Sequence, residues 1–334
     1  MFVLSIEDTH RLIAETLERC DTSPANAASV AKALIAAECA GQAGHGMRRL
    51  PSYAAQASSG KVDGYARVVC EQVAPAALKI DAAHGFAYPA LDAMHARLPE
   101  MAKTNGIAVA GIHRSHHCGV AGVIVEQLAD AGLVALMFAN TPAAMAPAGG
   151  SKAIYGTNPI AFAAPRGDAG PIVVDVSLSK VARGKIMAAK QSGKPIPEGI
   201  ALGPDGEPTT DADAALAGTM LPIGDAKGTA LALMVELLAA GVTGASYAAD
   251  ASSFLSADGP PPGTGQLVIA IDPTKFGGEA IIHHINALAC QIENQDGARV
   301  PGARRREIAQ KVRENGIEID DDLLKAIQSV GVNS

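Results

Sequence analysis

The chain has 334 residues, of which 48% are hydrophobic and 18% charged, a composition typical of a globular protein with a large core. Its formal net charge is -7 and only 3% of its residues are aromatic, which argues against nucleic-acid binding, because that needs a cationic surface and stacking rings. No apolar run reaches the ~18 residues that span a bilayer and no export signal is visible, so we expect a cytoplasmic protein without a membrane partner.

The first sixty residues favour an alanine-rich helical layer. A first helix is expected to begin at Ser5, and a second to run from Ser23 to about Ala40, where a serine followed by proline marks a helix start. Three glycines then interrupt the pattern around His45, before a third helix that passes through Tyr53.

The middle of the chain alternates short apolar stretches with helical ones. The expected strands cover residues 107–112, 133–139, 160–164, 172–176 and 266–272, and the expected helices between them cover 88–104 and 119–131. Residues 192–213 are rich in Gly, Pro, Asp and Thr and predict a long loop, and 227–240 predict a buried helix. From residue 274 onward the pattern is helical again, with a break at 301–302.

A helical start and finish around an α/β middle favours two domains. The expected helical domain is discontinuous, formed by residues 1–66 and 285–334, and the expected α/β domain covers 67–284. The chain contains neither G-x-G-x-x-G nor G-x-x-x-x-G-K-[ST], so a nucleotide would have to bind in another way. It also lacks G-x-S-x-G and H-E-x-x-H, which weakens the serine-hydrolase and zinc-protease interpretations.

His45, Arg49 and Tyr53 follow one another at four-residue spacing. On a helix these offsets bring side chains toward one face. A guanidinium grips a carboxylate in a fork, and an imidazole can give a proton to a developing alkoxide. The three residues therefore suit a small carboxylate substrate, although a helix-cap histidine beside a solvated arginine explains the pattern equally well.

Residues 113–119 read His-Arg-Ser-His-His-Cys-Gly and lie between an expected strand and an expected helix. Adjacent residues do not easily point at one ion, and no acidic partner lies nearby in sequence, so a metal centre is the less favoured interpretation. A metal-dependent hydrolase or lyase that uses the cluster from His113 to His117 stays open as an alternative of a different class. A loop that feeds a helix N-terminus is a more natural place for phosphate or nicotinamide contacts. The five cysteines contain no CxxC pair and predict reduced core thiols.

Three further segments combine turn residues with groups that could bind a ligand. They are residues 155–159, residues 175–179, which are expected to end a strand and open a helix, and the pair Lys227 and Gly228. Turn and cap chemistry explains each segment separately but not their occurrence together. His283 and His284 lie in a helical stretch and are expected to be packed or exposed rather than functional.

Together these segments resemble the type-2 malate/L-lactate dehydrogenase family, which is unrelated to the Rossmann lactate and malate dehydrogenases. The resemblance runs nearly end to end, and its motifs in this order are highly specific, although each alone would be weak. They are residues 44–46 with Arg49 and Tyr53, then 115–119, 156–159, 175–179, 182–185, 195–198, 208–211, 221–222, 227–228 and 301–302.

The resemblance implies a fold, an assembly and a cofactor. The fold is α/β (α+β), with a non-Rossmann NAD(P)-binding domain built on a mixed, largely antiparallel sheet and a helical domain from both chain ends. The assembly is a homodimer with the active site near the subunit interface. The cofactor is NADP or NAD, and NADPH is slightly favoured because Arg183 and the run from Arg304 to Arg306 could pair with an adenosine phosphate.

The same resemblance implies roles for individual residues, and it implies no metal ligand. His45 is the expected proton donor, and Asp175 is grouped with it as catalytic. Substrate binding is expected of Arg49, Tyr53, His117 and Thr157. Cofactor binding is expected of His117, Val174, Asp175, Val176, Ser177, Leu178, Lys227, Gly228, Arg304, Arg305 and Arg306.

The resemblance therefore implies an NAD(P)-dependent oxidoreductase that reduces small 2-oxo acids to 2-hydroxy acids, of the malate, lactate or sulfolactate type. The alternative within the family is a reductase of cyclic imines, Δ1-piperideine-2-carboxylate or Δ1-pyrroline-2-carboxylate. Family members usually carry serine before the catalytic histidine, where this chain has Gly44, and that serine supports the histidine in the imine-reducing branch. Residues 140–147 with 115–119 look closer to the sulfolactate type, and the missing lysine near Thr141 argues against ureidoglycolate. A non-catalytic ligand-binding protein is the remaining class.

Overall fold

A seven-stranded sheet forms the centre of the protein, whose computed structural model describes residues 2–331. Only β3 and β4 run parallel to each other, and the other neighbouring pairs in this sheet are antiparallel. This confirms the mixed, largely antiparallel sheet, although the β2–β3 hairpin at its edge was not expected. The strands in spatial order are β2 (Val69–Ala74), β3 (Ala77–Asp81), β4 (Ile107–Ser115), β10 (Thr264–Ile271), β5 (Val134–Ala139), β6 (Ile160–Ala164) and β7 (Ile172–Val176).

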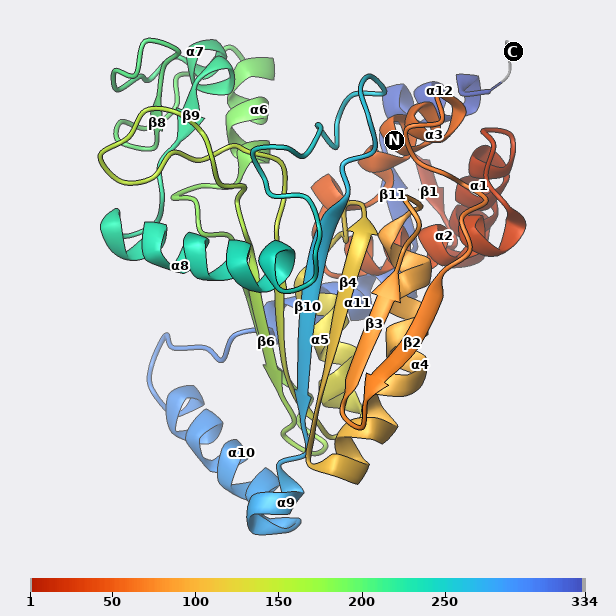
Figure 1. Ribbon diagram of the computed structural model, residues 1–334, viewed down its shortest axis with the longest axis vertical. Helices are drawn as coiled ribbons and strands as arrows, with labels where there is room; N and C mark the ends of the chain where they lie inside the picture. Colours follow the sequence, from red (N-terminus) through yellow and green to blue (C-terminus); the bar gives the residue numbers. More distant parts are fainter. Residues whose placement is uncertain (1, 332–334) are drawn as a thin grey trace.

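One face of the sheet packs against α4 (Ala87–Asn105) and α5 (Ala121–Asp130), as Figure 1 shows. Successive side chains of a strand point to opposite faces, so alternate residues enter this core. On β4 these are Ala108, Ala110 and Ile112, each 0–1% exposed. The many alanines let the helices approach the sheet closely, which gives the molecule its main core.

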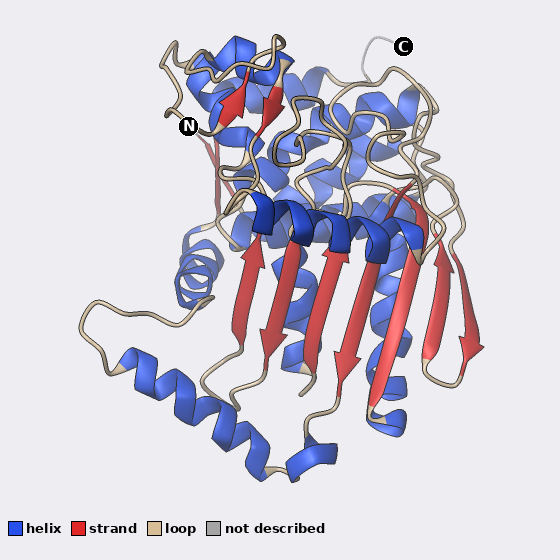
Figure 2. Ribbon diagram, turned by 60° about the vertical axis from the view of Figure 1, so that its left-hand side comes forward, coloured by secondary structure: helices blue, strands red, loops and turns tan. Residues whose placement is uncertain are grey.

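The opposite face of the sheet carries one long helix, α8 (Ala226–Glu236), which crosses the strands in Figure 2 and continues as a π-helical turn (Leu237–Gly241). A buried helix was expected over residues 227–240. The helix is present, but the prediction that it is buried was wrong for one of its two sides. Ala232 and Val235 are fully buried, but Leu231, Leu233, Met234 and Leu237 are 38–49% exposed. The helix packs by one side only, because none of residues 2–331 covers the other.

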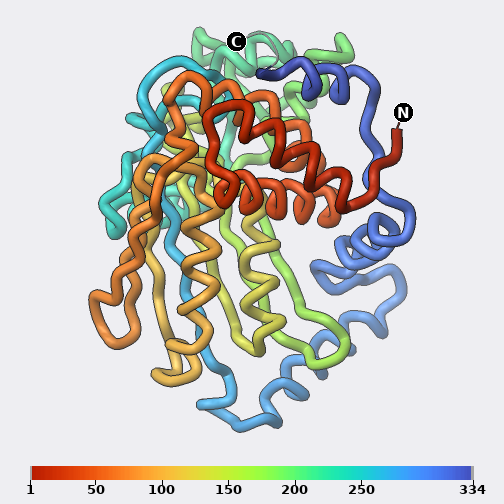
Figure 3. The backbone as a smooth tube through the Cα atoms, turned by 90° about the vertical axis from the view of Figure 1, so that its right-hand side faces the viewer, coloured from red at the N-terminus to blue at the C-terminus, as the bar shows by residue number. Residues whose placement is uncertain are grey.

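Segments from the two ends of the chain pack together: α11 (Ala303–Asn315) lies against α2 (Pro24–Cys39), and the red and blue segments adjoin in Figure 3. Strand β1 (Phe2–Leu4) pairs antiparallel with β11 (Ile317–Ile319), neither of which was expected. Both chain ends therefore contribute to one helical layer, while the proposed domain division stays a prediction and its boundary after residue 284 falls inside α10 (Ala280–Glu293). The helices of this layer are α1 (Ile6–Glu18), α2 (Pro24–Cys39), α3 (Leu50–Ser58), α11 (Ala303–Asn315) and α12 (Asp321–Ser329).

A small lobe stands beside the sheet and has its own apolar core. It contains α6 (Arg183–Gln191), β8 (Ala201–Leu202), α7 (Ala212–Ala217) and β9 (Thr219–Met220). The loop predicted over 192–213 is largely irregular but includes β8 and the start of α7. Ile196 and Ile200 are 4% and 8% exposed and pack in the lobe's core, which explains why so polar a stretch is ordered.

An arm formed by α9 (Thr274–Gly277) and α10 (Ala280–Glu293) projects from the lower end of the sheet in Figure 1. Ala289 is the single buried residue among the described residues of these two helices. Arg166 ties the arm to the body by donating to both carboxylate oxygens of Glu293 at 2.9 Å. His283 and His284 are exposed, in line with the expectation for them. None of the helices among residues 2–331 is long and apolar enough to cross a membrane.

Candidate active site

A cleft of about 560 Å³ opens between the helical layer, the ends of β4, β5 and β7, and the lobe. Polar and apolar groups from seven separate segments of the chain line it. They are residues 42, 45 and 49; 117–121; 140–144; 157 and 159; 175 and 177; 182–184; and 248–255, of which 250 and 252 do not face the cleft.

His45 and Arg49 reach the cleft from two short 3-10 turns, Ala43–His45 and Met47–Arg49, instead of from one regular helix. Glu38 fixes these turns, since its carboxylate accepts from the backbone N–H of Met47 at 2.7 Å. A Cβ on Gly46 would lie 2.1 Å from that carboxylate, so the second glycine of the motif is required by space. Arg49 donates from Nε to the carbonyl of Gly44 at 2.8 Å, which holds the guanidinium beside His45.

A chain of hydrogen bonds leads from His45 into the interior. Nδ1 of His45 lies 3.0 Å from Nε2 of His117, and the two rings are stacked with centroids 5.0 Å apart. Nδ1 of His117 lies 2.5 Å from the hydroxyl of Tyr53, which in turn lies 3.0 Å from the hydroxyl of Tyr88. Tyr53 is fully buried behind His117 and is absent from the cleft wall among the described residues, so the geometry gives it contact with His117 where substrate contact was expected.

The histidines of the cleft are held neutral. Burial, together with the charge of Arg49, lowers the pKa of His45 to about 4. Burial also lowers the pKa of His117 well below its ordinary value, with smaller contributions from Arg49, His45 and His116. Burial raises the pKa of Tyr53 to about 12. At neutral pH in the ligand-free protein, each imidazole therefore carries one proton and Tyr53 keeps its own.

The remaining histidines of the 113–118 run face different partners. His116 lies 3.0 Å from the amide oxygen of Gln56, and burial lowers its pKa to about 3. His113 lies 3.7 Å from Asp81, on the far side of β4. Across residues 2–331 no group of three or more His, Cys, Asp or Glu residues is arranged to hold a metal ion. The run therefore spreads its imidazoles over three environments and does not converge on one point.

Asp175 stands at the end of β7, next to the first turn of α5. Its carboxylate accepts from the N–H of Gly122 at 2.8 Å and lies 3.6 Å from the guanidinium of Arg305. Burial raises the pKa of Asp175, and the bonds from Gly122 and Arg305 oppose that rise. A Cβ on Gly122 would lie 2.5 Å from the guanidinium of Arg305 and 2.8 Å from the Asp175 carboxylate, so a larger residue would displace these side chains. The helix predicted directly after residue 179 begins at Arg183 instead.

Two helix N-termini open onto the cleft, and in neither of them does the side chain of the preceding residue form a cap. Helix α5 begins after Val120, and in its first turn the N–H of Gly122 already donates to the Asp175 carboxylate. Helix α6 begins after Ala182, which provides no side-chain cap for the N–H groups of its first turn. Helix N-termini carry partial positive charge and bind phosphate groups well. Arg183 adds a full charge at the second one, where burial lowers its pKa. This side of the cleft is suited to the phosphates and ring of a dinucleotide.

The loop that closes the cleft, residues 251–258, is fastened to α3 and the residues after it. The ammonium group of Lys61 donates to the carbonyls of Ser253, Ser256 and Asp258 at 2.7–2.8 Å. Gln56 donates to the carbonyl of Phe254 at 3.0 Å. The ring of Phe254 then lies 5.4 Å from that of His117, centroid to centroid. The loop therefore forms a fixed apolar wall of the cleft.

A buried carboxylate fixes the floor of the cleft. Glu236 on α8 is 5% exposed and accepts from the side-chain amides of Asn140 and Asn158 at 3.0 and 2.7 Å. It also accepts from the N–H of Ala248 at 2.6 Å. Because Asn140 and Ala248 line the cleft, α8 determines the position of two of its walls.

The cleft brings together part of the residue set expected from the sequence. Lining residues from that set are His45, Arg49, His117, Thr157, Asp175 and Ser177. Outside the cleft wall lie Tyr53, Val174, Val176, Leu178, Lys227, Gly228, Arg304, Arg305 and Arg306. Of the second group, Tyr53 and Arg305 contact lining residues directly.

Several residues of the site were not foreseen. Asn140 and Phe254 line the cleft, and Gln56, Lys61 and Tyr88 support it from behind. Asn140 had a signal, because it is the first polar residue after an apolar strand. The others resemble ordinary core or surface residues, since their partners are 35 to 198 residues away in the chain.

Comparisons with known proteins agree on one family. A model described as malate/L-lactate dehydrogenase matches residues 4–328. The chain is 47% identical to the (2R)-3-sulfolactate dehydrogenase (NADP(+)) of Chromohalobacter salexigens, over 99% of this chain and 98% of that one. It is 39% identical to a Δ1-pyrroline-2-carboxylate/Δ1-piperideine-2-carboxylate reductase of Pseudomonas aeruginosa, over 97% of each. The solved δ1-piperideine-2-carboxylate reductase of Pseudomonas syringae superposes with a TM-score of 0.93 at 36% identity, over 99% of this chain and 100% of that one.

Proposed function

The chain belongs to the malate/L-lactate dehydrogenase family of NAD(P)-dependent oxidoreductases, and we propose that it reduces a small 2-oxo acid to the 2-hydroxy acid. The observation that carries this proposal is the pairing of His45 with Arg49 in the cleft, which is also lined by the first residues of α5. A bound nicotinamide cofactor supplies the hydride; the proton and the grip on the substrate come from the protein.

Arg49 and His45 act on different groups of the substrate. Arg49 binds the carboxylate, since a guanidinium matches its two oxygens. His45 faces the oxygen that becomes negative, and its Nε2 is the ring nitrogen that His117 leaves free. A neutral imidazole can act as the donor, as it does in triosephosphate isomerase, because its N–H is matched to a developing alkoxide. Thr157 lies on the same cleft wall and offers a hydroxyl to the substrate.

The cofactor fits the other half of the cleft. The N-terminal turns of α5 and α6, together with Ser177, would hold its phosphates and nicotinamide end. Asp175 and Arg305 would keep α5 in place through Gly122, which makes Asp175 a support of the cofactor pocket in this proposal. Arg183 beside the start of α6 favours NADPH over NADH, as does the NADP(+) named for the 47% identical relative. Fluorescence titration with both cofactors tests this, and tighter binding of NADH would contradict it.

Reduction of a cyclic imine with a carboxylate on its C=N carbon is the second candidate. It is favoured by the likeness to the two imine reductases and requires the same grip by Arg49. Gly44 precedes His45 where the family usually carries serine, and an added Cβ there would meet open space. Gly44→Ser is therefore sterically permitted, and it should raise the ratio of imine to 2-oxo acid turnover if that serine supports imine reduction.

Substrate choice is tested by following NADPH absorbance with a panel of 2-oxo acids and the two cyclic imines. We expect turnover of 2-oxo acids, with the oxo form of 3-sulfolactate among the better ones, since the 47% identical relative is named for that acid. Turnover of the imines alone would replace the first candidate by the second. The geometry does not favour the metal-dependent alternative, because His113, His116 and His117 face separate partners.

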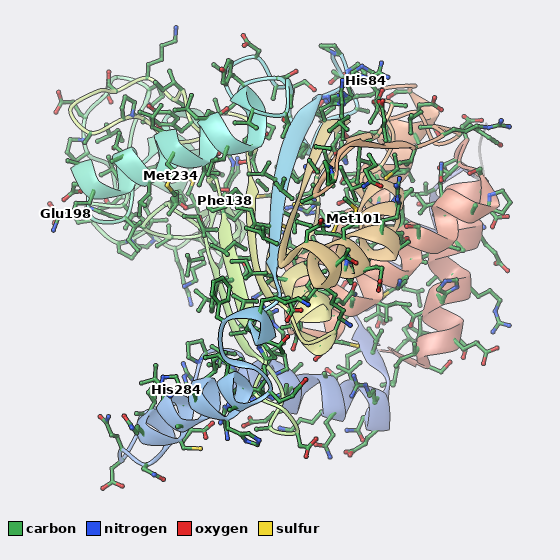
Figure 4. The ribbon with its side chains drawn as sticks, turned by 60° about the horizontal axis from the view of Figure 1, so that its bottom comes forward. His84, Met101, Phe138, Glu198, Met234 and His284 are labelled. Carbon is green, nitrogen blue, oxygen red and sulfur yellow. The ribbon has the colours of Figure 1, made fainter. Side chains whose placement is uncertain are left out.

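The assembly that we propose is a homodimer. The sheet face that α8 crosses, α8 itself and the α10 arm all present apolar side chains to solvent. In Figure 4, α8 with Met234 and α10 with His284 lie on the same side of the molecule, opposite the N-terminal helices. Exposed apolar surfaces of this extent mark protein interfaces. The most exposed members are Phe276 (82%), Val242 (68%), Leu288 (61%), Leu237 (49%), Ile107 (49%) and Leu233 (45%).

A further inference from the structure

The hydrogen-bond chain His45–His117–Tyr53–Tyr88 has only two consistent arrangements of its protons. Each neutral imidazole carries one ring proton and each phenol one hydroxyl proton. Every link holds a single proton, so the direction of one link sets the direction of the next. Either all links donate toward His45 or all donate toward Tyr88.

Counting donors separates the two directions. In the arrangement in which every link donates toward His45, Tyr88 donates to Tyr53 and Tyr53 donates to Nδ1 of His117. Nε2 of His117 then donates to Nδ1 of His45. Every buried donor of the chain is then satisfied, and the free N–H is on Nε2 of His45, in the cleft. In the opposite arrangement, in which every link donates toward Tyr88, the hydroxyl of Tyr88 has no acceptor in the described part of the chain. Unpaired buried donors are costly and rare.

We propose that Tyr88 is a positioning residue whose hydroxyl, acting through Tyr53 and His117, holds His45 in the tautomer with its proton on Nε2. The inference rests on the proposed function, because that tautomer matters only if His45 is the proton donor. The low pKa values of His45 and His117 support it, since both rings have to be neutral for the count to apply.

The chain also balances the protons of one turnover. The N–H bond at Nε2 of His45 breaks as the new O–H bond of the product forms, and Nδ1 of His45 takes the proton of His117. His117 then takes the proton of Tyr53, whose oxygen keeps the electron pair and is stabilised by the hydroxyl of Tyr88. After product release, a cleft water gives a proton to Nε2 of His45, the other protons return to their donors, and hydroxide leaves.

Space around Tyr88 is restricted on the side of the cleft. A Cβ on Gly119 would lie 2.9 Å from the hydroxyl of Tyr88, and Gly119 has a positive φ of 73°. Tyr88 also borders a small cavity of about 50 Å³ between α2, α4 and α5. A water in that cavity is the one competing acceptor for the Tyr88 hydroxyl, and it would reverse the chain.

Nitrogen-15 NMR of histidine-labelled full-length protein reads the tautomers directly, because protonated and bare ring nitrogens differ widely in chemical shift. The lines are assigned with His45→Gln and His117→Gln. We expect both residues to carry the proton on Nε2 in the unmodified chain and to show a mixture of tautomers in Tyr88→Phe and in Tyr53→Phe. Tyr65→Phe is the matched control, because Tyr65 is 62% exposed and does not line the cleft.

Kinetics give the second readout. Tyr88→Phe should lower kcat severalfold, less than the roughly 10²–10⁴-fold contributed by a general acid, and should leave the substrate KM unchanged. A proton on Nδ1 of His45 in the unmodified chain overturns the proposal. So does a folded Tyr88→Phe with unchanged tautomers and kcat. The NMR result is independent of any substrate, so failure to reduce 2-oxo acids with the expected tautomers refutes the proposed function alone.

Discussion

Arg49 and His45 hold opposite ends of a small substrate, so their variants should fail in different ways. His45→Ala should cut kcat by roughly 10²–10⁴-fold, the contribution typical of a general acid, with cofactor affinity nearly unchanged. Arg49→Lys should mainly raise KM, since an ammonium group cannot reproduce the two-pronged grip. Arg48→Lys is the control, because Arg48 is exposed and pairs with Asp320 away from the cleft. Near-normal turnover of His45→Ala, with His117→Ala inactive, would move the donor to His117.

His116 is expected to make the protein sensitive to acid. Its pKa is about 3 in the folded chain and near 6.5 when unfolded, so below pH 6.5 the unfolded state binds a proton that the folded state does not. The sign is therefore loss of stability as pH falls, by about 2 kcal/mol between pH 6.5 and 5 for this group. Urea unfolding at both pH values should show a smaller loss for His116→Asn than for the unmodified chain. An equal loss in both would show that His116 is not held neutral by the fold.

The site residues that could be predicted from the sequence are those whose role is indicated by residues close to them in the chain. His45 and Arg49 share a short motif with glycines, and their spacing alone indicated a common face. Tyr53 also belongs to the motif, but its contact with His117 depends on how α3 packs, which spacing does not give. Tyr88 and Gln56 had no signal, because a buried tyrosine and a helical glutamine are common in any core.

At the scale of elements, the loop of residues 251–258 depends on a single ammonium group. Lys61 is 3% exposed and satisfies three loop carbonyls, so Lys61→Met should leave these carbonyls unpaired or open the loop to water. An unsatisfied buried polar group costs about 1–3 kcal/mol, so the melting temperature should drop clearly. KM for the substrate should also rise as Phe254 leaves His117. Lys79→Met on the exposed side of β3 is the matched control, and a KM like that of the control would rule out the positioning role.

Elements with a strong apolar pattern were predictable, and those completed by distant partners were not. Strands β4, β5, β6, β7 and β10 are mostly apolar runs and were expected close to their observed bounds. β2 has mostly exposed side chains, because it is the edge of the sheet and lacks the alternation that marks a half-buried strand. Helix α8 had the apolar content of a buried helix, but the described residues leave the side chains on one of its sides partly exposed.

For the whole molecule, the exposed apolar surfaces of α8 and α10 predict an obligate dimer. Such interfaces commonly bury over ~2,000 Å², so light scattering at micromolar concentration should give twice the 33.9 kDa of one chain. Met234→Asp with Leu233→Asp should give monomers with little activity, because α8 also fixes Asn140 through Glu236. Val73→Asp on the edge strand β2 is the control, as it adds a charge to a residue that is 54% exposed. A fully active monomer would refute a site that depends on the interface.

The pairing of β1 with β11 has a consequence for biosynthesis. During translation the N-terminal helices emerge first, yet β1 receives its partner only when residues 317–319 leave the ribosome. The N-terminal layer therefore lacks the β1–β11 pairing until the whole sheet has been synthesised. Contacts between residues so distant in sequence also form slowly. Because β1 and β11 are neighbours, joining the chain ends by a linker long enough to pass along α1 and opening the chain at another surface loop should yield a circular permutant in which this layer is contiguous. Such a permutant should refold faster than the natural chain order if closure of β1 on β11 limits the rate.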